Sequence, residues 1–171
     1  GIPVWAISVA RFVDGRPSEV FLDVPALGQR IMALRGRGVM RNEQALTTAT
    51  RQHANSACVS LCSRSIRVLQ RKPNQPFPGK IRLFGVASLN LVSVAMGQTI
   101  AALEATPKIW DLAAAWLVLD ELGCPIRWLD IDPAELSPGQ DLSQTSFPML
   151  AAGSWSELAR FLPWGEALLQ P

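Results

Sequence analysis

The most constraining feature of the sequence is a Trp-Asp pair, Trp110 and Asp111, that opens a run of small and apolar residues. Three alanines follow at residues 113–115, and Gly123 stands where a helix of about three turns would end. An Asp at the head of such a run is typical of an N-cap. We therefore expect a helix over residues 111–122 with Asp111 as its N-cap.

A second carboxylate stands close before this helix. Glu104 lies seven positions before Asp111 and closes an apolar segment that predicts a strand over residues 99–104. The two carboxylates should meet at the carboxyl edge of a sheet. Hard oxygen ligands at one spot suit a divalent cation and a polyhydroxylated or phosphorylated ligand.

The first third of the chain has the pattern of an antiparallel meander. Asp14-Gly15 is a strong hairpin signal, and further turns are expected at residues 25–28 and 35–38. Strands are expected over residues 4–13, 19–24, 29–34 and 39–42.

The remainder alternates strand and helix. Together with the meander, this order predicts an α/β layered sandwich and one domain over residues 1–171, with a meander portion 1–55 and an alternating portion 56–171. Besides the strand and helix described above, strands are expected over residues 56–61, 80–83, 126–130 and 148–152, and helices over residues 63–70, 86–96 and 154–168. Pro163 should break or kink the last helix.

Composition excludes several classes of protein. The net charge of +2 gives no reason to expect nucleic acid, and no apolar run reaches the roughly 20 residues of a membrane span. The basic turn with Arg30, Arg35, Arg37 and Arg41 lacks interleaved aromatics, so a solvated hairpin end is favoured over a nucleic-acid contact. His53 has no Ser or Cys placed for a nucleophilic triad.

The three cysteines, Cys58, Cys62 and Cys124, are an odd number without zinc-site spacing, which favours buried thiols in a reducing cytoplasm.

Four motifs stand in a fixed order along the chain. They are Arg-Gly-Arg-Gly-Val at 35–39 with Asn42, Arg-Leu-Phe-Gly-Val-Ala-Ser-Leu at 82–89, Trp-Asp-Leu-Ala-Ala at 110–114 preceded by Glu104, and Leu-Asp-Glu-Leu-Gly at 119–123. Together they resemble the inositol monophosphatase family, part of the larger group that includes fructose bisphosphatase. The resemblance covers most of the chain.

The resemblance implies a magnesium-dependent phosphomonoesterase in which carboxylate-held metal ions bridge the phosphate and activate water. It makes Asp111 a Mg²⁺ ligand and Glu104 an acceptor of hydrogen bonds from a polyol leaving group. It also implies a small phosphorylated substrate such as an inositol phosphate, sugar phosphate, histidinol phosphate or nucleotide bisphosphate, and a homodimer. The other substrate-binding residues that it implies are Gly85, Val86, Ala87 and Ser63.

The chain departs from the family pattern in three ways. Two elements that supply further metal ligands in the family have no counterpart here, namely a helix Glu and an Asp-Pro-hydrophobic-Asp-Gly-Thr loop. Asp132-Pro133 matches only the first two residues of that loop and stands at the wrong position. Val86 stands where Ser or Thr is usual, and Ala115 replaces a usual Gly. We therefore expect the later part of a longer enzyme, and we expect these 171 residues alone to be inactive.

Two other functions stay open at this point. The chain could be a short relative that lost catalysis and serves as a binding or assembly module. A basic nucleic-acid binder would instead show a steep dependence of its affinity on salt.

Overall fold

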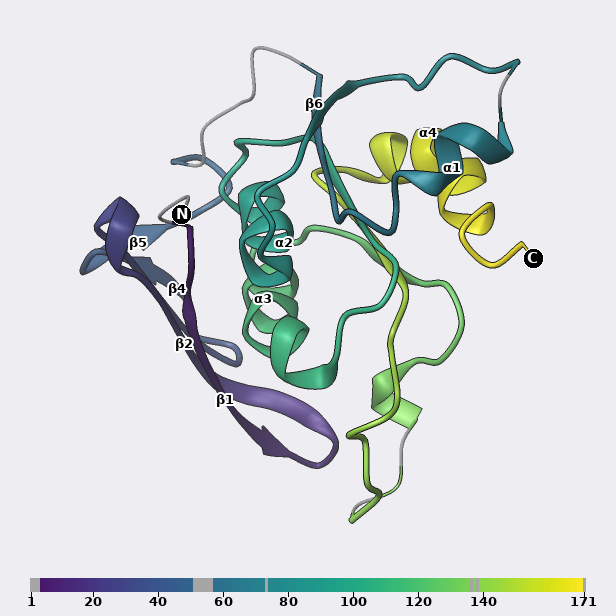
Figure 1. The fold of residues 1–171 in the computed structure, drawn as a ribbon. Coiled ribbons are helices and arrows are strands. Elements are labelled where there is room, and N and C mark those ends of the chain that lie inside the picture. Colours follow the sequence, from purple (N-terminus) through teal and green to yellow (C-terminus); the bar gives the residue numbers. More distant parts are fainter. Residues whose placement is uncertain (1–3, 51–56, 73, 136, 138, 171) are drawn as a thin grey trace.

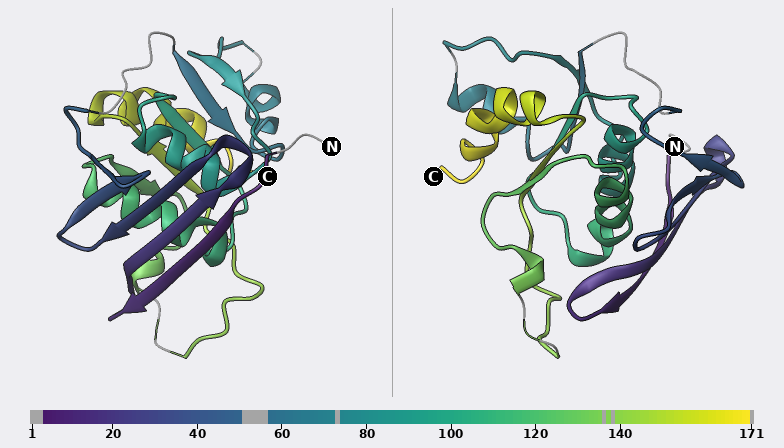
Figure 2. Two further views of the ribbon diagram at one scale, coloured as in Figure 1. Left: turned by 90° about the vertical axis from the view of Figure 1, so that its left-hand side faces the viewer. Right: turned by 180° about the vertical axis from the view of Figure 1, so that it is seen from behind.

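The computed structural model describes residues 4–50, 57–72, 74–135, 137 and 139–170. Its elements stack in four layers, which are an antiparallel sheet, two helices, a mixed sheet and two further helices (Figure 1). The views from the side and from behind show the same order (Figure 2). The predicted α/β layered sandwich is therefore confirmed.

The first sheet is a meander whose strands pair in sequence order. Asp14 and Gly15 both have positive φ, as the predicted hairpin requires. Asn42 and Glu43 also have positive φ (48° and 66°) and make a tight turn into a short strand that the sequence analysis missed. The strands are β1 (Ile7–Val13), β2 (Arg16–Val24), β3 (Gln29–Leu34), β4 (Gly38–Arg41) and β5 (Gln44–Leu46), with a 3₁₀ turn, η1 (Pro25–Leu27), between β2 and β3.

The second sheet is mixed, with the strand order β7-β6-β8-β10-β9. Its strands are β6 (Cys58–Leu61), β7 (Lys80–Arg82), β8 (Ala101–Glu104), β9 (Ile126–Trp128) and β10 (Met149–Ala152), and η2 (Pro133–Glu135) follows β9. Strands β6 and β8 are parallel, and Leu61 lies opposite Leu103. Both strands therefore end at one edge, which brings the residues after β6 beside Glu104 at the end of β8.

The helices are α1 (Arg67–Arg71), α2 (Ala87–Ala95), α3 (Ile109–Glu121) and α4 (Trp155–Glu166). Helices α2 and α3 lie between the two sheets, with α3 packed on the meander and α2 on the mixed sheet. Helices with protein on both sides are apolar on nearly all faces, which explains the apolar sequences of α2 and α3. Among the described residues, no helix is both long and apolar enough to cross a bilayer.

Two details of the helix predictions are wrong. Helix α3 begins at Ile109, so Asp111 is its third residue and not its N-cap. Of the break or kink predicted at Pro163, the break is absent, because α4 continues to Glu166. The predicted cap of α4 is present, because the Glu157 N–H donates to Ser154 Oγ at 3.3 Å.

Candidate functional site

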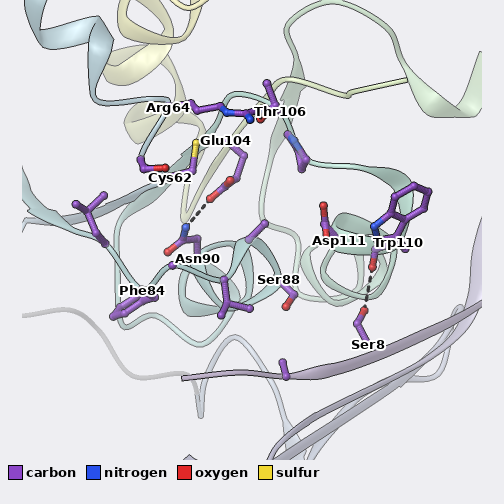
Figure 3. Close-up of a pocket in the computed structure, with 17 residues that line it drawn as sticks. Ser8, Cys62, Arg64, Phe84, Ser88, Asn90, Glu104, Thr106, Trp110 and Asp111 are labelled. Atoms are coloured by element: carbon purple, nitrogen blue, oxygen red, sulfur yellow. Dashed lines mark hydrogen bonds between the residues drawn. The ribbon is translucent and has the colours of Figure 1, made fainter. Parts of the chain in front are cut away.

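A cavity of about 700 Å³ opens where β6 and β8 end and where α2 and α3 begin (Figure 3). Its walls come from distant parts of the sequence, including Ala6 and Ser8 at the start of the meander. The residues predicted to bind metal or substrate all line this one cavity, namely Ser63, Gly85, Val86, Ala87, Glu104 and Asp111.

Asp111 enters the cavity from the first turn of α3. Its Oδ2 accepts a hydrogen bond from the Lys108 N–H at 2.9 Å, which fixes the carboxylate at the start of the helix. The partial positive charge of a helix N-terminus interacts favourably with a carboxylate in this position. Asp111 can thus present a negatively charged oxygen to a ligand.

Glu104 is almost completely buried, with 2% of its surface exposed. Its Oε1 accepts a hydrogen bond from Asn90 Nδ2 at 2.5 Å (Figure 3). Burial raises the pKa of Glu104 to about 7, the hydrogen bonds from Asn90 and Cys62 oppose this shift, and the negative charge of Asp111 adds to it. A buried carboxyl group with a strongly raised pKa that lines a cavity is a candidate functional group.

The turn before α2 supplies the opposite wall. Gly85 has a φ of +77°, a left-handed conformation that an L side chain rarely adopts, so the turn itself requires glycine here. Val86 then takes an extended conformation as the N-cap, and α2 begins at Ala87. The side chain of Val86 is half-buried against the core, which suits an apolar residue in place of the hydroxyl residue usual in the family.

Ser63 lies just beyond β6, is exposed and lines the cavity. Its neighbour Cys62 also lines the cavity and is only half-buried, so the expectation of a buried thiol is wrong for this cysteine. The Cys62 sulfur lies 2.9 Å from Ser65 Oγ and accepts a hydrogen bond from the Ser65 N–H at 3.3 Å.

Sequence reasoning missed several polar residues of the cavity, among them Asn90, Arg64 and Thr106. Asn90 carried a signal, because an amide in the middle of an otherwise apolar helix needs a buried partner. Arg64 and Thr106 carried none, since their contact joins two loops that are 42 residues apart.

The basic turn of the meander is not among the described residues that line this cavity. His53 is outside the described residues. Arg30 is 3.9 Å from Asp23, and Arg35 donates to the Pro17 carbonyl at 2.8 Å, so both belong to the hairpin ends of the meander.

The cavity does not contain a complete magnesium site. Magnesium needs near-octahedral coordination by several oxygens. Among the described residues, no group of three or more His, Cys, Asp or Glu side chains comes together as a metal would require. Asp111 alone therefore does not fit a bound magnesium ion.

Comparisons with known proteins agree with this architecture. The chain is 32% identical over 130 residues to the Nus factor SuhB of Xylella fastidiosa, which covers 72% of this chain and 47% of that protein. It is also 32% identical over 141 residues to the histidinol-phosphatase of Mycobacterium tuberculosis, covering 76% of this chain and 54% of that protein. The chain thus spans about half the length of these relatives.

Solved structures show the same fold. The extragenic suppressor protein suhB of Bartonella henselae has a TM-score of 0.69 at 22% identity, covering 99% of this chain and 66% of that chain. An IMPase/NADP phosphatase complexed with Mg²⁺ and phosphate has a TM-score of 0.68 at 22% identity, covering 97% and 59%. The model of the inositol monophosphatase family matches residues 1–158. The chain therefore belongs to the inositol monophosphatase family.

Proposed function

We propose that the intact protein is a magnesium-dependent phosphomonoesterase that acts on a small phosphorylated polyol, sugar or nucleotide. One observation carries this proposal, which is that Asp111 and Glu104 line the same cavity at the starts of α2 and α3. Phosphatases among the relatives support it, including a histidinol-phosphatase and the inositol-1-monophosphatase of Mycobacterium leprae.

Each residue of the cavity has a separate role in this proposal. Asp111 ligates a metal ion, which when bound neutralises phosphate charge. Glu104 accepts hydrogen bonds from hydroxyl groups of the leaving group. The backbone at Gly85, Val86 and Ala87 contacts the ligand at the start of α2, where N–H groups lack helical partners. Ser63 adds a polar contact at the rim of the cavity.

The other metal ligands would have to come from residues outside the described part of the chain. For this reason we predict that the 171 residues alone are inactive. A homodimer and a cytoplasmic location also stay predictions.

A phosphate-release screen on the full-length protein, with and without Mg²⁺, tests this function. We expect release from at least one small phosphate monoester only when Mg²⁺ is present. The positive charge of a bound metal ion stabilises the transition state by several kcal/mol, and Asp111→Asn weakens the binding of that ion. The variant should therefore lower turnover by roughly 100-fold or more. Full turnover in that variant would remove Asp111 from the metal site.

A second candidate function is a non-catalytic binding or assembly module. The incomplete metal site among the described residues favours it, as does the similarity to a protein named as a Nus factor. This alternative predicts that no small phosphate ester is hydrolysed at any Mg²⁺ concentration, even by the full-length protein.

A further inference from the structure

A second cavity, of about 460 Å³, lies at the other end of α3 from the cavity with Asp111. It forms where the last turn of α3 meets the start of β2, strand β9, η2 and the start of α4. Figures 1 and 2 show the hairpin end before β2 beside η2. Asp111 and Asp120 are about 13 Å apart along the helix axis. The two cavities share no lining residue, so the second is a separate site that the proposed function does not use.

Three tryptophans form the aromatic part of this cavity. Trp116 comes from α3, Trp128 from β9 and Trp155 from the first turn of α4. The rings of Trp116 and Trp128 meet at 77° with their centroids 5.3 Å apart, so they form two walls of a corner. Trp155 is 73% exposed, which leaves its ring free to contact a ligand. No Lys or Arg of the described residues lies over any of these three rings, although such contacts occur elsewhere in the chain.

The charged groups of the cavity give it an excess of negative charge. Asp120 and Asp132 line it together with Arg16, the one Lys or Arg among the described residues of its wall. Asp132 Oδ1 accepts a hydrogen bond from the Ala134 N–H at 2.8 Å, which holds this carboxylate at the turn before η2. Across the described ranges, no Lys or Arg comes within 4.0 Å of either carboxylate. A single positive charge on a ligand therefore balances the charge of the cavity when both carboxyl groups are ionised.

Partial desolvation distinguishes Asp120 from an ordinary surface carboxylate. Burial raises the pKa of Asp120 to about 6, whereas the charge of Arg16 and a hydrogen bond from the Trp116 indole oppose this shift. The negative charge of Glu121 adds to the shift, and the positive charge of Arg35 opposes it. A charge in a poorly hydrated site interacts more strongly with a ligand than a charge in water does. A cation beside Asp120 is therefore held more tightly than a cation at a fully hydrated carboxylate.

We propose that this cavity binds a quaternary ammonium ion, with its methyl groups against the three tryptophans and its charge beside Asp120 and Asp132. The faces of indole rings attract cations, and aromatic walls of this kind recognise quaternary ammonium groups. A primary ammonium has three N–H groups that each need an acceptor, whereas a quaternary ammonium leaves none unpaired. The volume of about 460 Å³ suits a small organic molecule, since pockets for such ligands span roughly 300–1,000 Å³. This inference is independent of the proposed phosphatase function.

Calorimetric titration of choline into the full-length protein at pH 8 tests the inference. The neutral isostere of choline, 3,3-dimethylbutan-1-ol, has the same shape without the charge. A desolvated contact between a cation and indole rings implies that choline binds roughly 10-fold or more tightly than the neutral alcohol. Equal affinity for the two compounds, or no binding of choline, would overturn the inference.

Variants of the lining residues assign the binding to this cavity. Asp120→Asn should weaken choline binding by roughly 10-fold or more, and the exposed Trp155→Ala by several-fold. Arg16→Gln removes a like charge, so it should strengthen choline binding, whereas it would weaken the binding of an anion. The matched changes Arg11→Gln and Asp141→Asn, on exposed residues outside the cavity wall, should leave the affinity unchanged. Unchanged affinity in Asp120→Asn and Trp155→Ala, or weaker binding in Arg16→Gln, would refute the site.

Proton release gives a second readout. A cation beside Asp120 lowers the pKa of that carboxyl group, so choline should displace protons at pH 6, where about half of Asp120 is protonated, and not at pH 8. Calorimetry at pH 6 in two buffers of different ionisation enthalpy should show release of up to about half a proton per choline. Asp120→Asn should abolish this release. No release from the parent, or release that persists in Asp120→Asn, would place the cation away from Asp120 and contradict the inference.

Discussion

Glu104 is a buried carboxyl group, and no Lys or Arg of the described residues forms an ion pair with it. It accepts a hydrogen bond from the amide of Asn90, and burial is the main cause of its raised pKa. A buried carboxylate without a cation destabilises the folded state once it is ionised. A buried group that destabilises the fold is expected at a site that binds a ligand.

This burial predicts a pH-dependent gain of stability in Glu104→Gln. The pKa of Glu104 rises from 4.5 to about 7 on folding. Below pH 4.5 the carboxyl group is protonated in both states and does not lower the stability of the folded protein. The folded protein loses stability as the pH rises from 4.5 through 7. The full loss is about 3 kcal/mol, from about 1.4 kcal/mol per pKa unit. Urea unfolding at two pH values measures this difference. At pH 8, Glu104→Gln should be more stable than the parent by up to this amount, and at pH 4.5 the two proteins should have similar stabilities.

The exposed Glu166→Gln serves as the control, and it should leave the two stabilities unchanged. A Glu104→Gln variant that is less stable than the parent at pH 8 would show that the ionised carboxylate is stabilised by its surroundings. The same variant should bind a polyol phosphate more weakly, because the amide of glutamine offers one acceptor oxygen in place of two.

At the residue scale, the sequence predicted the short-range part of the site and missed the long-range part. Asp111 and Glu104 were found because a strand end and a helix start lie close together in the chain. The partners Asn90, Arg64 and Thr106 depend on which strands lie side by side in the sheet. Strand order in a mixed sheet is set by packing of the whole chain and leaves no local pattern.

Helix α3 connects the site to the meander. Asp111 lies in its first turn, and Glu121 is its last residue. The two carboxylate oxygens of Glu121 accept hydrogen bonds from the N–H groups of Gly36 and Gly38, each at 2.7 Å. The Arg-Gly-Arg-Gly turn is therefore fixed to the end of α3, which gives that motif a structural role.

This double hydrogen bond predicts that Glu121→Ala destabilises the protein by about 2 kcal/mol, since hydrogen bonds to charged groups contribute roughly 1.5–3 kcal/mol and water partly replaces them here. Glu121→Gln, which retains one acceptor oxygen, should lose about half as much. Urea denaturation of the parent and both variants measures the difference. A loss below about 0.5 kcal/mol in Glu121→Ala would mean that the turn holds its shape without α3.

At the element scale, the errors of the sequence analysis have physical causes. The predicted strand over residues 4–13 is shorter in the structure, because β1 pairs with β2 only from Ile7. Helix α4 continues through Pro163, because its apolar face packs against the mixed sheet. Local propensity fixes the type of an element better than its ends.

At the scale of the whole molecule, the outer face of the meander is open among the residues that the structure describes. The inner face of the meander is covered by α3, whereas an outer row of apolar side chains runs across its strands. Val9 pairs with Phe21, Phe21 with Met32, and Met32 with Met40. Val9 is 56% exposed and Met32 45%. A continuous apolar patch on a sheet favours association.

We therefore predict that the 171-residue chain by itself associates or is poorly soluble. Light scattering coupled to size exclusion should show species larger than a monomer. Met32→Lys, which places a charge in the middle of the apolar row, should reduce that association, whereas Arg127→Lys on the other sheet should not. A monomeric parent chain that unfolds cooperatively would contradict the prediction.

The account as a whole depends on whether Asp111 ligates a metal ion in the cavity. Calorimetric titration of Mg²⁺ into the full-length protein, into Asp111→Asn and into the exposed control Asp141→Asn tests this most directly. Loss of a ligand should weaken Mg²⁺ binding by more than roughly 10-fold in Asp111→Asn, while Asp141→Asn binds as the parent does. Equal Mg²⁺ affinity in all three proteins would contradict the account.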